Sequence, residues 1–342
     1  MIFGRDLGID LGTATVVLVT RGKGVIAREP SVVAMDRVTG KILKSGSAAE
    51  RMLGRTPGNI AAIHPLQGGV ISDFEMTQSM IGELIKKVIS FSLVKPRVLI
   101  SVPSGITEVE ERAVIDAAIN AGARKVYLCE APVAAAVGAG LDISKAEGNL
   151  VVDIGAGTTD IAVLSLGGVV RSKSIKVAGD AFDEALIKNI RKKNNLLIGK
   201  TTAEELKRSI GCVFPKTEEQ TMEIKGRSLM TGLPSNLTVS STETIEAFDE
   251  VSSEIIEAIH SVLEETPPEL VADVAGNGIV LTGGGSLLWG FDRLIESATS
   301  IKTRIADDAE LCVAYGMVKK MEELGEMEDG PLNLARRRQL RG

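Results

Sequence analysis

The feature that most constrains the fold is a turn that the chain contains twice. The stretch GIDLGTATVV, residues 8–17, and the stretch VVDIGAGTTD, residues 151–160, share one pattern. In each, an apolar run leads through an aspartate to a turn rich in Gly, Ala and Thr, and a second apolar run follows. One such turn is typical of an ordinary hairpin, whereas two matching turns indicate a chain built from two related halves.

Each half continues from its hairpins into alternating helices and strands. Residues 5–35 and 149–176 alternate short apolar runs with turns, which predicts antiparallel hairpins. Thr107 followed by Glu110 is a capping-box pattern that starts a helix, Gly122 is suited to its end, and Pro132 fits the first position of another helix. Further helices are expected at 81–89, 180–194, 202–211, 243–264, 285–298 and 308–324, and strands at 95–103, 125–128 and 278–284.

Composition excludes several classes of function. Lys and Arg number 39 against 45 Asp and Glu, and aromatic residues make up 3%, which argues against a basic or base-stacking surface for nucleic acids. Cys129, Cys212 and Cys312 have no metal-site spacing, and His64 and His260 are the only histidines. The uncharged stretch 274–291 is as long as a membrane span, but its glycines predict a strand, a turn and a helix start instead.

The repeated turn has the chemistry of a phosphate site. Gly12 and the pair Gly155 and Gly157 let backbone N–H groups approach an anion, and Thr13, Thr15, Thr158 and Thr159 add hydroxyl groups. Asp10 and Asp153 lie near the ends of their strands and carry the hard oxygen ligands that Mg²⁺ prefers. Two such turns facing each other would hold a polyphosphate from both sides. A third stretch, GIVLTGGGSLLWGF, adds a glycine turn with a helix start, where free amides favour a nucleotide.

These three stretches, in this order, resemble the actin/hexokinase/heat-shock-chaperone ATPase superfamily. Within it the chain is similar to the MreB/Mbl family of bacterial actins, whose pattern resembles stretches from residue 5 to about 320. The stretches that carry the resemblance include GIDLGTA, RGKGV, EPSVVA, GRTPGNI, KPRVLISVP, VEERAVIDA, GNLVVDIGAGTTDIAV, VAGDAFD, TAEELK, TGLP, TPPELVADV and GIVLTGGGSLLWGFD.

The resemblance implies an α/β, actin-like bilobed fold. Its two related RNase H-like halves, each with an inserted smaller subdomain, would surround a nucleotide cleft. The implied boundaries are 1–32, 75–140 and 315–330 for subdomain IA, 33–74 for IB, 141–181 and 247–314 for IIA, 182–246 for IIB and 331–342 for a basic tail.

The resemblance also implies the site residues of an ATP- or GTP-binding protein with Mg²⁺. Asp10 and Asp153 would lie at the metal, and Glu204 and Lys207 would border the ribose and base, although an ion pair between these two is an equally open interpretation. The nucleotide would further contact Gly12, Thr13, Ala14, Gly155, Ala156, Gly157, Thr158, Gly179, Asp180, Gly283, Gly284 and Gly285.

One position departs from the family pattern. Members usually have Glu directly before the Pro, where it positions the attacking water, and this chain has Ala131 there, with Glu130 one residue earlier. Because neighbouring residues of an extended segment point opposite ways, Glu130 is a poor substitute. We therefore expect nucleotide binding with slow hydrolysis.

The family further implies paired protofilaments in the cytoplasm on the inner face of the plasma membrane. There they would organise cell-wall elongation and rod shape with partners of the RodZ, MreC and MreD kinds. Phe91, Leu93 and Val94, beside cationic residues, suit shallow insertion into an anionic leaflet, with packing under a helix as the alternative. The rival functions are a filament protein for segregation or organelle positioning, and a small-molecule kinase of the superfamily, for which no catalytic aspartate was found.

Overall fold

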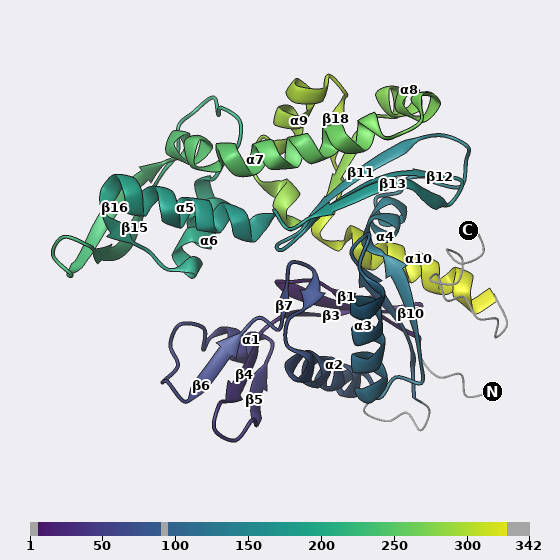
Figure 1. The fold of residues 1–342 in the computed structure, drawn as a ribbon, viewed down its shortest axis with the longest axis horizontal. Coiled ribbons are helices and arrows are strands. Elements are labelled where there is room, and N and C mark those ends of the chain that lie inside the picture. Colours follow the sequence, from purple (N-terminus) through teal and green to yellow (C-terminus); the bar gives the residue numbers. More distant parts are fainter. Residues whose placement is uncertain (1–5, 90–94, 327–342) are drawn as a thin grey trace. The chain divides into compact units, whose positions relative to one another are not determined.

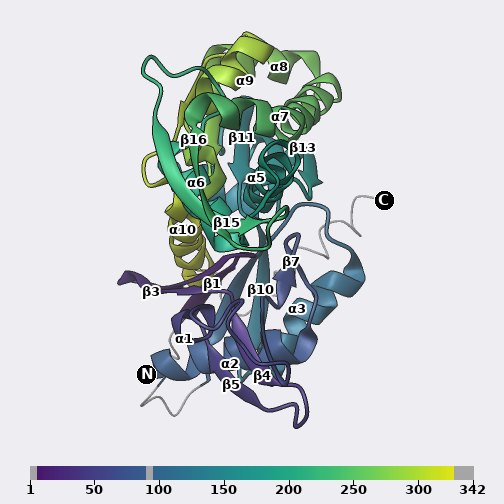
Figure 2. The ribbon, with the colours of Figure 1, turned by 90° about the vertical axis from the view of Figure 1, so that its left-hand side faces the viewer.

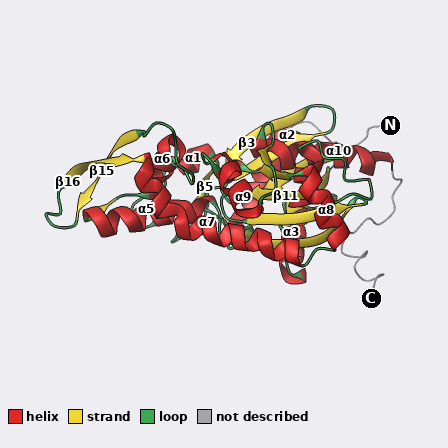
Figure 3. Ribbon diagram, turned by 90° about the horizontal axis from the view of Figure 1, so that it is seen from above, coloured by secondary structure: helices red, strands yellow, loops and turns green. Residues whose placement is uncertain are grey.

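The computed structural model describes residues 6–89 and 95–326. The chain divides into two compact units, which we call the first unit (Met1–Asp142 with Leu311–Gly342) and the second unit (Ile143–Glu310). Helices and strands alternate through both of them (Figure 3). None of the described helices combines the length and the apolar character that crossing a membrane requires.

The first unit is built on a five-stranded sheet in the order β10-β9-β1-β2-β3 (Figure 1). Strands β1, β2 and β3 form an antiparallel meander, while β9 pairs parallel with β1 and β10 pairs parallel with β9. Its elements are β1 (Asp6–Leu11), β2 (Thr15–Thr20), β3 (Gly24–Pro30), β9 (Arg97–Val102), β10 (Lys125–Glu130), α2 (Phe74–Ile89), α3 (Glu108–Asn120), α4 (Ala131–Gly138) and α10 (Cys312–Glu326).

The second unit repeats this topology in the order β18-β17-β11-β12-β13. Here β11, β12 and β13 form the antiparallel meander, and β17 and β18 continue the sheet in parallel. Its elements are β11 (Asn149–Ile154), β12 (Thr159–Ser165), β13 (Gly168–Ile175), β17 (Ile279–Thr282), β18 (Thr303–Ile305), α5 (Gly179–Asn194), α6 (Lys200–Ile210), α7 (Ser241–Glu264), α8 (Pro268–Asn277), α9 (Phe291–Thr299) and the 3₁₀ turns η1 (Gly284–Leu287) and η2 (Ala309–Leu311).

Each unit also carries a smaller sheet. In the first unit it is β5-β4-β6, built from β4 (Val33–Asp36), β5 (Ile42–Ser45) and β6 (Ile60–Ile63), with α1 (Ser47–Glu50) and the short pair β7 (Leu66–Gln67) and β8 (Val70–Ile71). In the second unit it is β14-β15-β16, built from β14 (Leu196–Leu197), β15 (Thr221–Ser228) and β16 (Pro234–Ser240). Figure 2 shows the long β15–β16 hairpin with α5 and α6 beside it.

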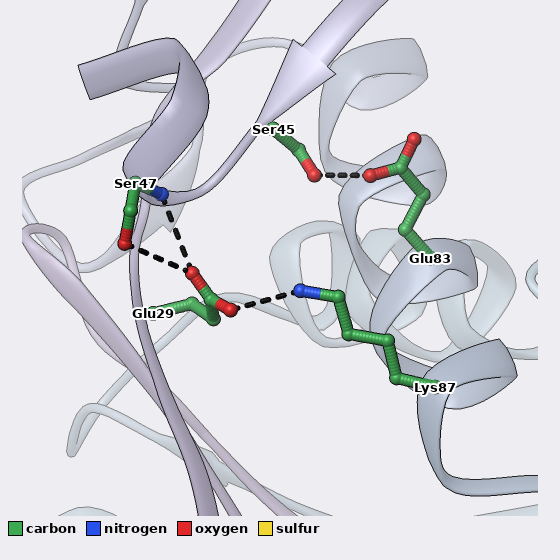
Figure 4. A network of polar contacts seen from close by, with 5 residues as sticks. All are labelled: Glu29, Ser45, Ser47, Glu83 and Lys87. Atoms are coloured by element: carbon green, nitrogen blue, oxygen red, sulfur yellow. Dashed lines mark hydrogen bonds and ion pairs between the residues drawn. The ribbon is translucent and has the colours of Figure 1, made fainter. Parts of the chain in front are cut away.

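A polar network attaches the small sheet of the first unit to α2 (Figure 4). Glu29 on β3 accepts hydrogen bonds from Ser47 N at 3.3 Å and Ser47 Oγ at 3.2 Å, and from Lys87 Nζ on α2 at 2.8 Å. The Lys87 hydrogen bond holds the pKa of Glu29 below its usual range. Ser45 at the end of β5 donates to Glu83, also on α2. Two contacts on one helix thus fix the edge of the small sheet.

Helices α4 and α10 cross at a pair of glycines. A Cβ atom at Gly138 would lie 1.8 Å from Cys312 O, and a Cβ atom at Gly316 would lie 1.8 Å from Ala134 O. No side chain fits at that separation, so both helices need glycine for their backbones to approach. This crossing holds α4, whose first residue is Ala131, against the helix that contacts β1.

The core of the second unit centres on three aromatic rings. Phe182 lies edge-to-face against Phe248, with ring centroids 5.0 Å apart, and against Phe291 at 5.8 Å. These rings join α5, α7 and α9 in a cluster that includes the buried faces of β11 and β12. Helix α5 is therefore fixed by its apolar face, which leaves its first turn to serve the site described below.

Most of the predicted elements are confirmed. Both hairpin sets are present, the capping box of Thr107 and Glu110 opens α3, and Gly122 follows that helix with φ +114°. Within the stretch 274–291, β17 and the turn at η1 follow the end of α8, and the strand and the turn are those that the glycines predicted. Helix α2 begins earlier than expected, at Phe74, and α8 was not predicted although it begins at a proline.

Two expectations about helix starts are wrong. The helix predicted at 285–298 is a single 3₁₀ turn, η1, followed by a break at Gly290 (φ +85°) and then α9. Glycine loses more conformational entropy than other residues when it enters a helix, so the 3₁₀ turn does not extend into a longer helix. Pro132 occupies the second position of α4, because the helix already begins at Ala131.

Candidate functional site

The first glycine turn closes the hairpin between β1 and β2. Leu11 pairs with Val16, so residues 12–15 make a tight reversal, and a Cβ atom at Gly12 would lie 2.6 Å from Thr15 O. Ser31 fixes the turn from β3's side, since its Oγ donates to Gly12 O at 2.6 Å and its N–H donates to Ala14 O at 2.8 Å. The backbone of the turn is therefore held in one conformation by the neighbouring chain.

Asp10, two residues before Gly12, receives a hydrogen bond from the adjacent parallel strand. Ser101 Oγ on β9 donates to Asp10 Oδ1 at 2.7 Å and accepts from Leu11 N at 3.1 Å. Burial raises the pKa of Asp10 to about 6, and the Ser101 hydrogen bond partly offsets that rise. A carboxylate held in such surroundings lacks enough compensating charge, which is a property of metal- and ligand-binding groups.

The second glycine turn closes the hairpin between β11 and β12 in the same way. Ile154 pairs with Thr159, and Gly155 N donates to Thr158 O at 2.9 Å across the turn. The first turn of α5 is bonded to it, because Gly179 N donates to Gly155 O at 3.1 Å and Asp180 N donates to Ala156 O at 2.8 Å. The structure thus brings Gly155, Ala156, Gly179 and Asp180 together.

Asp153 repeats the arrangement of Asp10. Thr282 Oγ1, on the adjacent parallel strand β17, donates to Asp153 Oδ1 at 2.9 Å. In both units, an aspartate on the first strand of the meander accepts a hydrogen bond from a hydroxyl group on the adjacent parallel strand. In both, this aspartate lies two residues before the first glycine of the turn. The duplication in sequence is therefore a duplication of side-chain geometry as well.

The third glycine-rich stretch packs directly on the second turn. Gly283 has φ +81°, and a Cβ atom there would lie 2.3 Å from Ile154 O and 2.7 Å from Asp153 Oδ1. A Cβ atom at Gly285 would lie 3.0 Å from Gly155 O, and one at Gly284 would face Glu310 at 3.3 Å. Only glycine lets this stretch approach Asp153 so closely, because residues 283–285 have no side chains to occupy the space beside the carboxylate.

Lys207 on α6 contacts α5 rather than Glu204. Its Nζ donates to Gly179 O at 2.8 Å and to Asp183 Oδ2 at 2.9 Å. Glu204 is exposed and lies 3.6 Å from Arg208. The alternative of an ion pair between Glu204 and Lys207 is therefore wrong, because a carboxylate on the next helix lies closer to the ammonium group.

Glu130 and Ala131 stand where β10 passes into α4. Glu130 is the N-cap residue, in extended conformation, and its Oε2 accepts from Ser104 Oγ at 3.1 Å. The sequence predicts that both residues belong to one extended segment. This is wrong, because Ala131 is already the first residue of the helix. Ala131 presents a methyl group at the position where the resemblance predicts a carboxylate.

The hydroxyl groups of the two turns are not equivalent. Thr13 Oγ1 accepts from Gly69 N at 3.1 Å. Thr159 is fully buried and donates to Val177 O at 2.7 Å, so its hydroxyl belongs to the core and the expectation that it serves a ligand is wrong. The expected membrane residues Phe91, Leu93 and Val94 lie outside the described residues.

Sequence reasoning missed three residues of this region: Ser101, Thr282 and Asp183. The first two stand near the carboxyl ends of buried strands, in KPRVLISVP and GIVLTGG, and a hydroxyl at that place was a signal available in the sequence. Asp183 had no such signal, because only the packing of α5 on α6 brings it to Lys207.

A metal ion would need ligands beyond the protein. In residues 6–89 and 95–326, no group of three or more His, Cys, Asp or Glu side chains is arranged to hold one. Asp10 and Asp153 each supply carboxylate oxygens beside a glycine turn. Mg²⁺ is usually held by one or two carboxylates together with water and substrate phosphates, so the carboxylate beside either turn has the chemistry that this ion requires.

Comparison with known proteins identifies the family. The model of the MreB/Mbl protein family matches residues 4–329. The chain belongs to the MreB/Mbl family. Two curated relatives are similar over almost their whole length. The cell shape-determining protein Mbl of Bacillus cereus is 49% identical, and the match covers 95% of this chain and 98% of that protein. The cell shape-determining protein MreB of Escherichia coli K12 is 47% identical, and the match covers 97% of each chain.

A crystal structure of another MreB protein confirms the predicted actin-like fold. MreB5 of Spiroplasma citri bound to AMPPNP has a TM-score of 0.89 and 38% identity, covering 95% of this chain and all of that chain. The same protein bound to ADP has a TM-score of 0.91 and 37% identity, covering 95% of this chain and 99% of that chain. In this MreB/Mbl family member, the duplicated halves of the sequence are therefore the two α/β halves of an actin-like chain.

Proposed function

We propose that this chain is a nucleotide-dependent bacterial actin that polymerises into filaments determining cell shape. The observation that carries the proposal is the duplicated site: in each unit, an aspartate bonded to a hydroxyl group on the parallel strand stands beside a glycine turn. Each of these turns has the backbone amides and the carboxylate that suit the phosphates and the metal ion of a nucleotide. The relatives named cell shape-determining proteins support the cellular role.

The nucleotide would be ATP or GTP with Mg²⁺. The solved relative from Spiroplasma citri binds AMPPNP and ADP, which supports a nucleotide here. Backbone N–H groups of the two glycine turns would bind phosphate oxygens, Lys207 would border the ribose and base, and the stretch Gly283–Gly285 would back the nucleoside. The metal ion would neutralise charge on the phosphates, and Asp10 and Asp153 would hold it directly or through water.

Hydrolysis would be slow in the unaltered chain. In-line attack on the γ-phosphate needs a group that orients the water, and Ala131 offers only a methyl group. Glu130 is already engaged by Ser104 and lies one residue outside the helix. Loss of a water-orienting group commonly lowers the rate by about 10²–10⁴-fold while phosphate contacts persist. Filaments of this protein would therefore outlast those of a relative with Glu at this position.

The filaments would lie on the inner face of the plasma membrane and work with cell-wall elongation proteins. This part of the proposal rests on the family and on the composition of the stretch SFSLVKPR, in which Phe91, Leu93 and Val94 precede the exposed Lys95, whereas Arg97 is paired with Asp6. Apolar residues beside cations favour shallow insertion into anionic lipid. Partners of the RodZ, MreC and MreD kinds would then connect the filament to the wall machinery.

One experiment tests nucleotide binding and assembly together. Fluorescent ADP and ATP analogues are titrated into the purified chain with Mg²⁺ or with EDTA, and sedimentation with ATP or GTP follows polymer formation. We expect Mg²⁺-dependent binding and a sedimenting polymer for the unaltered chain. Asp153→Ala should weaken binding at least tenfold, because it removes a metal-side carboxylate.

The matched control is Asp292→Asn, which alters an aspartate in the first turn of α9 and should change neither result. If Asp153→Ala bound nucleotide and polymerised like the unaltered chain with Mg²⁺ present, the duplicated site would not be the nucleotide site. Phosphorylation of a small molecule without polymer formation would instead indicate a kinase of the superfamily.

A further inference from the structure

The ion pair of Lys207 and Asp183 is buried deeply for two charged side chains. The side chains are 16% and 10% exposed, and Nζ lies 2.9 Å from both carboxylate oxygens. The contact with Oδ2 has hydrogen-bond geometry, whereas Oδ1 is buried and has no hydrogen-bond partner. Desolvating two charges costs more than a surface ion pair does, so this pair is poorly explained as a contribution to stability alone.

Asp183 itself stands in unfavourable surroundings. Burial raises its pKa to about 6 in spite of Lys207, and the negative charges of Glu204 and Asp180 act in the same direction as burial. Its neighbour Phe182 already fixes α5 in the apolar core. The packing of this helix therefore does not need a carboxylate at position 183.

The pair joins α6 to the first turn of α5, which is hydrogen-bonded to the second glycine turn. Lys207 donates to Gly179 O, and the N–H group of that same residue donates to Gly155 O. One peptide bond further, Asp180 N donates to Ala156 O. A continuous path of hydrogen bonds thus runs from Asp183 through Lys207 and Gly179 to the glycine turn.

Three oxygen atoms surround the ammonium group of Lys207. Of the three N–H groups of Lys207, one is directed to Gly179 O and one to Asp183 Oδ2. A lysine ammonium on a four-carbon stem otherwise rotates freely and loses that freedom when it binds. With Gly179 O and both Asp183 oxygens within 2.9 Å, the ammonium group is held in one place before any ligand arrives, which lowers the entropy lost on binding.

We propose that Asp183 is a positioning residue, which fixes Lys207 and through it sets the affinity for nucleotide. The inference rests on the proposed function, and it adds a residue outside the glycine turns that acts on the site only through a second side chain. Asp183 also ties α6, and with it the small sheet β14-β15-β16 that α6 contacts, to the glycine turn.

A double-mutant cycle on the full chain tests this role. The dissociation constant of a fluorescent ADP with Mg²⁺ is measured for the unaltered chain, Lys207→Met, Asp183→Asn and the double variant. We expect Lys207→Met to weaken binding about tenfold and Asp183→Asn about threefold to tenfold, since contacting residues couple to this extent. In the Lys207→Met background, Asp183→Asn should change the dissociation constant less than twofold.

Controls separate positioning from general loosening of the fold. Glu246→Gln breaks an exposed pair between Lys193 on the same helix and α7, and it should leave nucleotide affinity unchanged. Circular dichroism establishes that each variant is folded. Where Asp183→Asn is not, Asp183→Ala takes its place in the cycle, with the same expected loss of effect when Lys207 is Met.

The outcomes are distinct. Additive effects of the two substitutions, or unchanged binding by Asp183→Asn with Lys207 intact, would overturn the positioning role while the nucleotide site stands. Absence of Mg²⁺-ADP binding by the unaltered chain would contradict the proposed function, and this inference with it.

Discussion

Replacing Asp10 by Asn should make the nucleotide-free protein more stable and a poorer nucleotide binder. Asp10 is held by Ser101 Oγ at 2.7 Å in surroundings that raise its pKa from 3.8 to about 6. Asn has the same shape, and its Oδ1 accepts the same hydrogen bond. The substitution therefore removes the buried negative charge and keeps the packing.

The sign and size of the effect follow from the two pKa values. Below pH 3.8 the carboxyl is protonated in both the folded and the unfolded chain, so its burial costs nothing. As the pH rises from 3.8 to about 6, the unfolded chain ionises this group while the folded chain keeps it protonated, so stability falls progressively and the loss is complete above about pH 6. At about 1.4 kcal/mol per tenfold step in acidity, the loss reaches about 3 kcal/mol at pH 7.5 and about half of that at pH 5. Partial exposure of the side chain makes these figures upper bounds.

Urea unfolding followed by circular dichroism, in EDTA and without nucleotide, measures the difference. Asp10→Asn should raise the free energy of unfolding at pH 7.5 by up to about 3 kcal/mol, with a smaller gain at pH 5. The exposed Asp116→Asn on α3 is the matched control and should stay within about 0.5 kcal/mol at both pH values. Asp10→Asn should also lose the Mg²⁺ dependence of nucleotide binding. An equal gain at both pH values, or no gain at pH 7.5, would refute the reasoning that an ionised Asp10 strains the folded chain.

Three further predictions address hydrolysis, packing and membranes. Ala131→Glu should raise phosphate release at least about tenfold and shorten filament lifetime, because it restores a water-orienting carboxylate; rapid release by the unaltered chain would contradict this. Gly316→Ala should lower the free energy of unfolding by about 1–3 kcal/mol or more, since its Cβ would lie 1.8 Å from a backbone oxygen of α4. Gly276→Ala in α8, where nothing lies within 4 Å, should instead gain up to about 1 kcal/mol; equal effects would show that the α4–α10 contact is looser than described. Changing Phe91 and Leu93 to Ser should abolish flotation with anionic liposomes and leave polymerisation intact, and unchanged flotation would exclude this stretch as the anchor.

Local patterns in the sequence were sufficient for much of the fold. The hairpins of both halves and the helix opened by Thr107 follow from alternation and capping, which depend on residues near one another in the chain. The helix predicted at 285–298 starts too early, although α9 confirms its later part. Its apolar spacing is helical, but the conformation of Gly290 and the close packing of Gly283 on Asp153 are decided by contacts with other strands.

The candidate site was predictable where it consists of backbone and first-strand aspartates. Asp10, Asp153 and the glycines can be predicted from their order in the chain. The partners that hold the aspartates, Ser101 and Thr282, come from strands far away in sequence, and only the parallel pairing of the sheets brings them near. The partner of Lys207 could not be chosen from the sequence, because Glu204 is the one acidic residue at helical spacing from it, whereas the observed partner, Asp183, lies on another helix.

The two halves of the chain are alike in their support for an aspartate and unlike in what surrounds it. Asp10 and Asp153 each accept a hydrogen bond from a hydroxyl group on the adjacent parallel strand. This indicates that the contact serves a task common to both halves, which is to hold a carboxylate beside a glycine turn. The second half adds contacts that the first lacks among the described residues: Gly283–Gly285 packed on Asp153 and its turn, and α5 bonded to Gly155 and held by Lys207. The first half instead carries Ala131 at the start of α4, fixed by the glycine crossing with α10. In the proposed nucleotide site, binding contacts thus gather in the second half, whereas Ala131, the position proposed to govern hydrolysis, belongs to the first. Substitutions in the second half should change nucleotide affinity, and substitutions at the α4–α10 crossing should change turnover in a chain that carries Glu at position 131.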